Sequence, residues 1–246
     1  MSKLIVARRK FLLGGAALIA APGIVRAQNV IGSGVYGDVK AGGPPPAFSW
    51  TFVGSAASVG GGGNTLAFGG ITVSSGLLII VVTAQDTLST PSVASVTFGA
   101  TSLAKAVDDG DVDYANSASI WYGVVTGGTQ TVSVTTTNTI TRASVSYGII
   151  TGATATPTAT QTAFVNPGTT PNVTIAVPTG GIAITAFNAD RTLTGTLSGA
   201  TLDDQLNLAS TSGQLLTTHT TTTGSVTVQY TGTNAITSVV SAAWGP

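Results

Sequence analysis

Short β-branched segments, each ended by a turn residue, follow one another from residue 48 to the end of this 246-residue chain. In residues 131–135, valine and hydroxyl side chains alternate with the period of two that a half-buried strand requires. Residues 77–82 form instead a continuous apolar run, too short for a helix, which predicts a strand buried on both faces. Stretches with helical periodicity are essentially absent. The pattern therefore predicts an all-β fold.

The same signals predict further strands, each bounded by Gly, Asn, Asp or Pro. They lie at residues 92–98, 119–125, 173–177, 182–187, 225–230 and 236–244. Threonine suits such strands because its branched Cβ stiffens χ1, and all 42 threonines follow residue 50. Successive strands without intervening helices predict an antiparallel β-sandwich over residues 48–246.

Two parts of this region resemble each other. Residues 76–86 are echoed by residues 181–190, each followed closely by Thr-Leu, and residues 133–141 are echoed by residues 227–237. The order of the elements matches as well as the letters, which favours duplication into half-repeats of about 48–150 and 172–246. A Thr/Ala/Pro-rich connection, residues 151–171, would join them. The alternative is convergence of two Thr-rich strands on similar letters.

Charge is scarce, since only 7% of the residues are charged, and five of the nine Lys and Arg residues lie within the first 26 positions. Once the first 27 residues are set aside, four cations face nine Asp. We therefore expect no binding of nucleic acid, which needs clustered cations against phosphate. The absence of Cys excludes disulfides, thiolate zinc sites and cysteine nucleophiles.

The first 27 residues have the pattern of a leader, in which Arg8, Arg9 and Phe11 resemble the twin-arginine export signal and Ala27 ends the candidate cleavage site. The apolar run at residues 11–21 is shorter than the roughly 20 residues that span a bilayer, so we expect no permanent membrane span. The alternative is an uncleaved helix docked on a partner. Residues 28–47, with three consecutive prolines, predict an extended arm or linker.

The strand series resembles a β-sandwich domain common in tailed-phage structural proteins and exported bacterial surface proteins. The resemblance rests on the Gly-led buried strand, the Ser-Ile-Trp-Tyr-Gly-Val-Val segment at residues 119–125 and the closing Ala-Trp-Gly. The leader is similar to those of small proteins encoded by tailed phages. The resemblance implies a jelly-roll-like architecture and a structural or adhesive role, and it carries over no site residue.

Asp109, Asp111 and Asp113 have the spacing with which a loop folds carboxylates around Ca²⁺. The full loop pattern is incomplete, because Tyr114 stands where Gly is required and Ile120 where a bidentate Glu belongs. A solvated acidic hairpin loop is the alternative.

Trp121 and Tyr122 are adjacent on one predicted strand, so one ring should point inward and the other outward. The outward ring is the candidate ligand contact, for instance for a sugar, although single aromatics on strands are more often core anchors.

The sequence offers few candidate catalytic residues. The only His, His219, lies in a Thr-rich segment and is expected to be solvated rather than part of a triad. Paired carboxylates for glycoside hydrolysis would have to come from Asp86, Asp190, Asp203 and Asp204. Three of these four follow strands or sit in turn-like contexts, which favours a structural role for them. We therefore expect no enzyme.

These observations favour a non-catalytic structural or adhesion protein, most simply an accessory virion protein of a tailed phage, as a head decoration or tail appendage. It would be homo-oligomeric or pack against other virion or surface proteins, because small hydroxyl side chains lose little entropy at interfaces. The alternative is an exported bacterial surface protein, in the periplasm or on the cell surface, that binds glycan. A third hypothesis is an exported hydrolase that uses Asp residues. No cofactor is expected beyond the candidate Ca²⁺.

Overall fold

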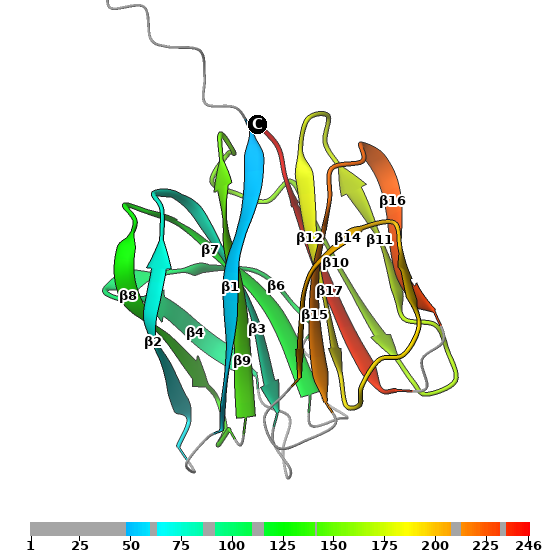
Figure 1. Cartoon of the computed structure of the whole chain (residues 1–246), viewed down its shortest axis with the longest axis horizontal. Helices are drawn as coiled ribbons and strands as arrows, with labels where there is room; N and C mark the ends of the chain where they lie inside the picture. The colour runs from blue at the N-terminus through cyan, green and yellow to red at the C-terminus, as the bar shows by residue number, and fades with distance from the viewer. Residues whose placement is uncertain are drawn as a thin grey trace, which may run out of the picture. The chain divides into compact units, whose positions relative to one another are not determined.

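The computed structural model describes residues 48–59, 63–85, 92–109, 116–140, 142–207, 213–231 and 235–246. All of them belong to one compact unit, Pro45–Pro246, called the body below. The described residues form antiparallel β-strands and no helix, which confirms the all-β sandwich (Figure 1). They contain no helix long and apolar enough to cross a membrane. The predicted leader, with Arg8, Arg9, Phe11 and Ala27, and the predicted arm lie outside the described residues.

The first half of the body contains the strands β1 Ser49–Val59, β2 Thr65–Val73, β3 Gly76–Gln85, β4 Val93–Phe98, β5 Thr101–Ser102, β6 Ala104–Asp108, β7 Asn116–Val125, β8 Gly128–Thr136 and β9 Arg142–Thr151. They form a first inner sheet of order β1-β9-β3-β7-β6 and a first outer sheet of order β2-β8-β4-β5. The strand β5 lies in the first outer sheet and the following strand β6 in the first inner sheet, so this stretch of the chain connects the two sheets.

The second half contains the strands β10 Ala159–Val165, β11 Asn172–Val177, β12 Ile182–Ala189, β13 Thr196–Ser198, β14 Thr201–Asn207, β15 Gln214–Thr220, β16 Gly224–Thr231 and β17 Thr237–Trp244. They form a second inner sheet of order β10-β17-β12-β15-β14 and a second outer sheet of order β11-β16-β13. Because β10 opens this half, the half starts earlier than the expected residue 172, inside the segment interpreted as a connection.

Both halves have the strand order of a jelly roll. If β5 and β6 are taken as one strand, the first strand of each half pairs with the last, the last with the third, and the third with the sixth. In the outer sheets the second strand pairs with the seventh, and the seventh with the fourth. Two sheets connected in this way are a jelly-roll sandwich. The shared order is a further observation in favour of duplication, which stays an interpretation.

The body is a stack of four layers: first outer, first inner, second inner and second outer sheet (Figure 1). Three hydrophobic cores separate these layers, one within each half and one between the two inner sheets. The strand β3 serves two of them, because Leu78 and Ile80 belong to the core of the first half while Leu77 and Ile79 belong to the central core. The prediction of a strand buried on both faces is therefore confirmed.

Each half uses the same glycine turn between its fourth and fifth strands. Gly99 and Gly199, both followed by Ala-Thr, have φ of 57° and 79°, a region that side chains other than glycine's rarely adopt. A Cβ on Gly199 would also collide with the Thr227 carbonyl of β16. The turn thus needs glycine for its backbone and for the close approach of the neighbouring strand.

We predict that Gly199→Ala destabilises the body by more than the about 1–3 kcal/mol expected from backbone strain alone. Gly168→Ala is the matched control, since Gly168 also has a positive φ of 89° but faces open space. Urea denaturation followed by tryptophan fluorescence would measure both free energies of unfolding. Equal losses in the two variants would contradict the contact with Thr227.

Burial raises the pKa of the Tyr147 phenol above its ordinary value of about 10. The folded body therefore keeps its proton at a pH where the unfolded chain releases it, so the contribution of Tyr147 to stability is complete below about pH 10 and lost above it. We expect the free energy of unfolding of the native chain to fall more steeply above this pH than that of Tyr147→Phe. Parallel slopes in alkaline denaturation series would refute this expectation.

Candidate functional site

A β-bulge in β14 directs two neighbouring carboxylates to the same side of the second inner sheet. Leu202 pairs with Thr218 and Asp204 with Thr217, so Asp203 is the extra residue of the bulge. Without the bulge, Asp203 and Asp204 would alternate between the two faces. With it, both reach the first inner sheet, where Asp203 contacts β1 and Asp204 contacts β9.

Asp203 joins three strands from both halves. Its Oδ1 lies 2.6 Å from His219 Nδ1 on β15, and its Oδ2 accepts a hydrogen bond of 3.1 Å from Trp50 Nε1 on β1. The side chain of Asp203 is only 7% exposed, whereas that of His219 is 25% exposed. His219 is therefore partly exposed and held by Asp203 rather than freely solvated, and Asp203 and Asp204 lie within a strand rather than in a turn.

The first inner sheet makes room for the ring of Trp50. A Cβ on Gly148 of β9 would overlap the Trp50 ring and the Thr51 carbonyl. The missing side chain of Gly148 thus allows the indole to lie against β9 and its Nε1 to reach Asp203.

Two further hydrogen bonds cross between the halves. Ser146 Oγ donates to Asp204 Oδ2 at 3.1 Å, and Asn188 Nδ2 donates to the Ser117 carbonyl at 2.9 Å. Asn188 is fully buried. The two inner sheets are therefore held together by directional bonds as well as by the apolar central core.

A carboxylate only accepts hydrogen bonds, so His219 donates from Nδ1 and its other ring nitrogen, Nε2, is left for an acceptor or donor role. A buried Asp and the His that it orients are two of the three members of a nucleophilic triad. Among the described residues, His219 makes no hydrogen bond with a hydroxyl. The arrangement orients an imidazole, which can bind a polar ligand.

A hollow of about 270 Å³ lies where β14 starts and β15 ends. It is lined by Gly199, Ala200, Thr201, His219, Thr220, Thr221, Thr222 and Val226. These residues come from the start of β14, the end of β15, the two turns beside them and the strand β16. The hollow is thus lined mainly by threonines, with Ala200 and Val226 as its apolar part.

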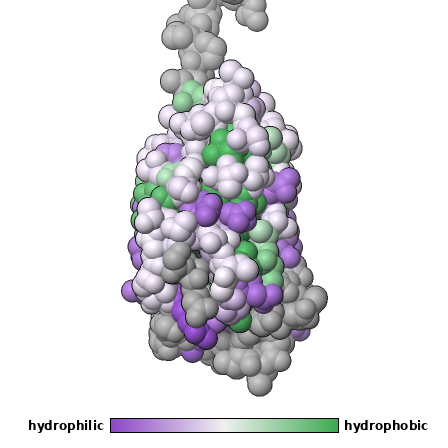
Figure 2. All heavy atoms as spheres, turned by 90° about the vertical axis from the view of Figure 1, so that its right-hand side faces the viewer, coloured by the Kyte–Doolittle hydropathy of each residue, from purple (hydrophilic) through white to green (hydrophobic). Residues whose placement is uncertain are grey.

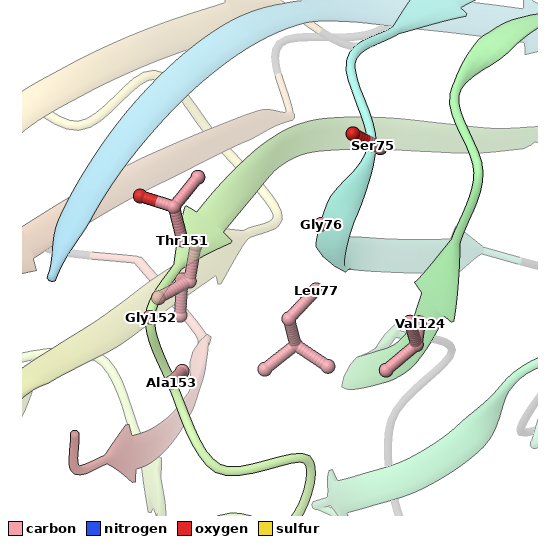
Figure 3. A pocket seen from close by; sticks show the side chains of 8 residues that line it. Ser75, Gly76, Leu77, Val124, Thr151, Gly152 and Ala153 are labelled. Carbon is pink, nitrogen blue, oxygen red and sulfur yellow. The ribbon is translucent and has the colours of Figure 1, made fainter. Parts of the chain in front are cut away.

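A second hollow, of about 410 Å³, lies where β3 starts and β7 and β9 end (Figure 3). Figure 3 shows Leu77 between Thr151 on one side and Val124 on the other, and Val124 is 66% exposed. None of the lining residues is titratable. This hollow offers apolar surface and hydroxyls but no group for acid–base chemistry.

Of the three residues of the predicted calcium site, the structure describes Asp109 alone. Asp109 Oδ2 accepts a hydrogen bond from the Ala118 amide, while Asp111 and Asp113 lie outside the described residues. In the described part of the chain, no three His or Asp side chains are grouped to hold a metal ion. The calcium site stays a prediction.

The expectation that one ring of Trp121 and Tyr122 faces outward is wrong. Their strand β7 belongs to an inner sheet that is covered on both sides, so both rings are packed. Trp121 is 4% exposed and donates from Nε1 to Ser119, while Lys105 lies over its ring. Tyr122 packs edge-on against Trp244, with ring centroids 6.2 Å apart. Both serve as core anchors, the alternative named above.

Comparisons of the chain with protein-family models, curated proteins and solved structures give no match. The function is therefore argued from the residues of this chain alone.

We predict that Asp203→Ala lowers the free energy of unfolding by at least about 1–3 kcal/mol, because it leaves both the Trp50 indole N–H and the His219 imidazole without their partner. Asp204→Ala is the matched control, because it removes only the single hydrogen bond from Ser146. Chemical denaturation of both variants gives the comparison. The same loss in both would argue against the double acceptor role of Asp203.

Proposed function

We propose that this chain is a non-catalytic structural and adhesion protein that assembles through its two outer sheets. The proposal depends on one observation above all, the absence of charge from the outward faces of these sheets. The first outer face consists of Thr65, Ala67, Thr72, Ser95, Thr97, Thr129, Thr131, Ser133 and Thr135. The second outer face consists of Asn172, Thr174, Ala176, Thr196, Ser198, Ser225, Thr227, Gln229 and Thr231.

Figure 2 looks at the side of β11 and β16, and most residues there are pale, the colour of intermediate hydropathy. Hydroxyl groups pair across the strands of both faces, as in Thr72 with Thr129 at 2.6 Å and Thr174 with Thr227 at 2.8 Å. The side chains of both faces are therefore small and neutral, and those that pair across strands are already partly ordered.

Such faces favour assembly for two physical reasons. Thr and Ser lose little side-chain entropy when a neighbour covers them, in contrast to Lys or Glu. Charged surface residues also keep soluble proteins apart, and these faces have none. Since the outer sheets are the first and last layers of the stack, the faces point in opposite directions. One chain can thus contact two neighbours, as an extended array requires.

The array we propose is an accessory layer of a virion, the head decoration or tail appendage of a tailed phage. Jelly rolls are frequent in viral capsid and lectin domains, which is compatible with a structural as well as an adhesive role. The alternative is an exported bacterial surface protein that binds glycan. It can no longer rest on an exposed ring of Trp121 or Tyr122, because both rings are packed.

We expect the purified full chain to form oligomers whose size grows with concentration, measured by light scattering after size exclusion. Lysine on each outer face, in the double variant Thr131→Lys and Thr227→Lys, should reduce them to monomers because charge is brought into both contacts. Thr156→Lys is the control, since Thr156 is equally exposed but lies in the loop between β9 and β10. A native chain that stays monomeric, or a double variant that assembles like it, would refute the proposal.

A further inference from the structure

We propose that the edge strand β10 pairs with β10 of a second copy of the chain, antiparallel and about a two-fold axis through Gln161. This contact is distinct from the two outer faces, although it relies on the assembly proposed above to bring copies together. It is supported by a comparison of the sheet edges, by the exposure of β10 and by its sequence.

The edges of the four sheets are protected in every described case except β10. A free sheet edge presents unpaired backbone groups, and proteins protect it with bulges, charges, prolines or short strands. The strands β1, β2, β6 and β14 each have a bulge, and β6 and β14 also carry charged side chains. The strands β5 and β13 have only two and three residues, and β11 lies between Pro171 and Pro178.

The strand β10, Ala159–Val165, has none of these protections. Its seven residues pair with β17 in an unbroken register, and they include no charge and no proline. No other described strand pairs with its second edge. Thr160, Gln161 and Thr162 are all exposed, so neither face of the strand is covered at its centre. The centre of β10 is therefore accessible to a further strand.

The sequence of β10 is self-complementary about Gln161. Residues 159–163 read Ala-Thr-Gln-Thr-Ala, the same in both directions. A two-fold contact places the same surface of both copies against each other, so Thr160 would lie opposite Thr162 of the second copy. The amide of Gln161 both donates and accepts hydrogen bonds, so it can pair with the same amide across the axis. A second copy of this chain is thus the partner that fits the edge.

The body already contains threonine pairs of the kind that this contact would form. Thr174 and Thr227 lie opposite each other on antiparallel strands, with their hydroxyl oxygens 2.8 Å apart. Thr160 and Thr162 lie on one face of β10 and would form two such pairs across the axis. Hydroxyl pairs directly across two strands stabilise antiparallel pairing.

The β10 contact and the outer faces point in different directions. The edge of a sheet points within the plane of the sheet, whereas the outer faces point along the stack of layers. The outer faces therefore lengthen a row of copies, and β10 joins two rows side by side. One strand from each copy is a small contact compared with the about 1,200–2,000 Å² buried in stable interfaces. It is therefore expected to hold between rows, where many contacts act at high effective concentration, rather than between dilute monomers.

The variant Gln161→Cys tests the axis directly, because the chain has no other Cys. Opposite residues of an antiparallel pair have Cβ atoms about 4.5–5.5 Å apart, close to the separation that a disulfide bridges. We expect the full-length variant under mild oxidation to form a covalent dimer at least about tenfold faster than Thr156→Cys, an equally exposed loop position. Non-reducing gel electrophoresis measures both rates, and equal rates would overturn the inference.

Charge variants test the opposed threonines. Added to Gln161→Cys, the pair Thr160→Lys/Thr162→Lys brings like charges opposite each other across the axis, and so does Thr160→Glu/Thr162→Glu. Each should slow cross-linking to the rate of the loop control, whereas an equimolar mixture of the two should restore it, because opposite charges then meet. Unfolding followed by tryptophan fluorescence confirms that each variant is folded. Failure of the mixture of folded variants to recover would overturn the pairing about Gln161.

The β10 contact and the assembly through the outer faces can fail separately. Light scattering of Gln161→Cys under reducing conditions reports the rows, whereas cross-linking reports the β10 contact. Oligomers without rapid cross-linking would overturn the β10 contact alone. Rapid cross-linking of a chain that is monomeric under reducing conditions would support the β10 contact and overturn the assembly through the outer faces.

Discussion

The structure depends on the burial of both faces of its two inner sheets. A jelly roll normally covers one face of each of its sheets, yet β3 and β12 carry apolar side chains on both faces. A second layer must therefore cover the other face of each inner sheet, and the inner sheet of the opposite half forms that layer. Burial of apolar surface is the dominant favourable term in folding. The body needs few charged residues for its stability, because much of its apolar surface is buried in three hydrophobic cores rather than one.

The same contact creates a titratable cluster that crosses between the halves. Where the central core ends, the inner sheets carry polar side chains, and these must find partners because an unpaired buried polar group is costly. Asp203 and Asp204 meet this need only through the bulge in β14. Bulges commonly re-aim side chains beside functional sites. The orientation of His219 is thus a by-product of joining two sandwiches, and it gives the surface an imidazole held in one position.

Much of the fold could be predicted from the sequence because its signal is local. The alternation in residues 131–135 and the apolar run at residues 77–82 determine faces without reference to any partner. The site could not be predicted in this way. A bulge adds one residue to a strand pair, so its position depends on the register with β15, and Trp50 and Asp203 lie far apart in the chain. The rings of Trp121 and Tyr122 were misjudged for a related reason, since alternation shows two faces but not whether another sheet covers the second.

The two halves share a short sequence motif at corresponding turns. Gly-Ala-Thr turns at residues 99–101 and 199–201 stand between the fourth and fifth strands of each jelly roll. After them, Ala104 pairs with Tyr122 as Thr201 pairs with His219, so the bulge residue Asp203 corresponds to Ala106, the bulge residue of β6. The first half has an apolar residue and an aromatic ring at these positions, whereas the second has a carboxylate and an imidazole. If the halves arose by duplication, this polar pair marks a place where they diverged, at the contact that joins the two sandwiches.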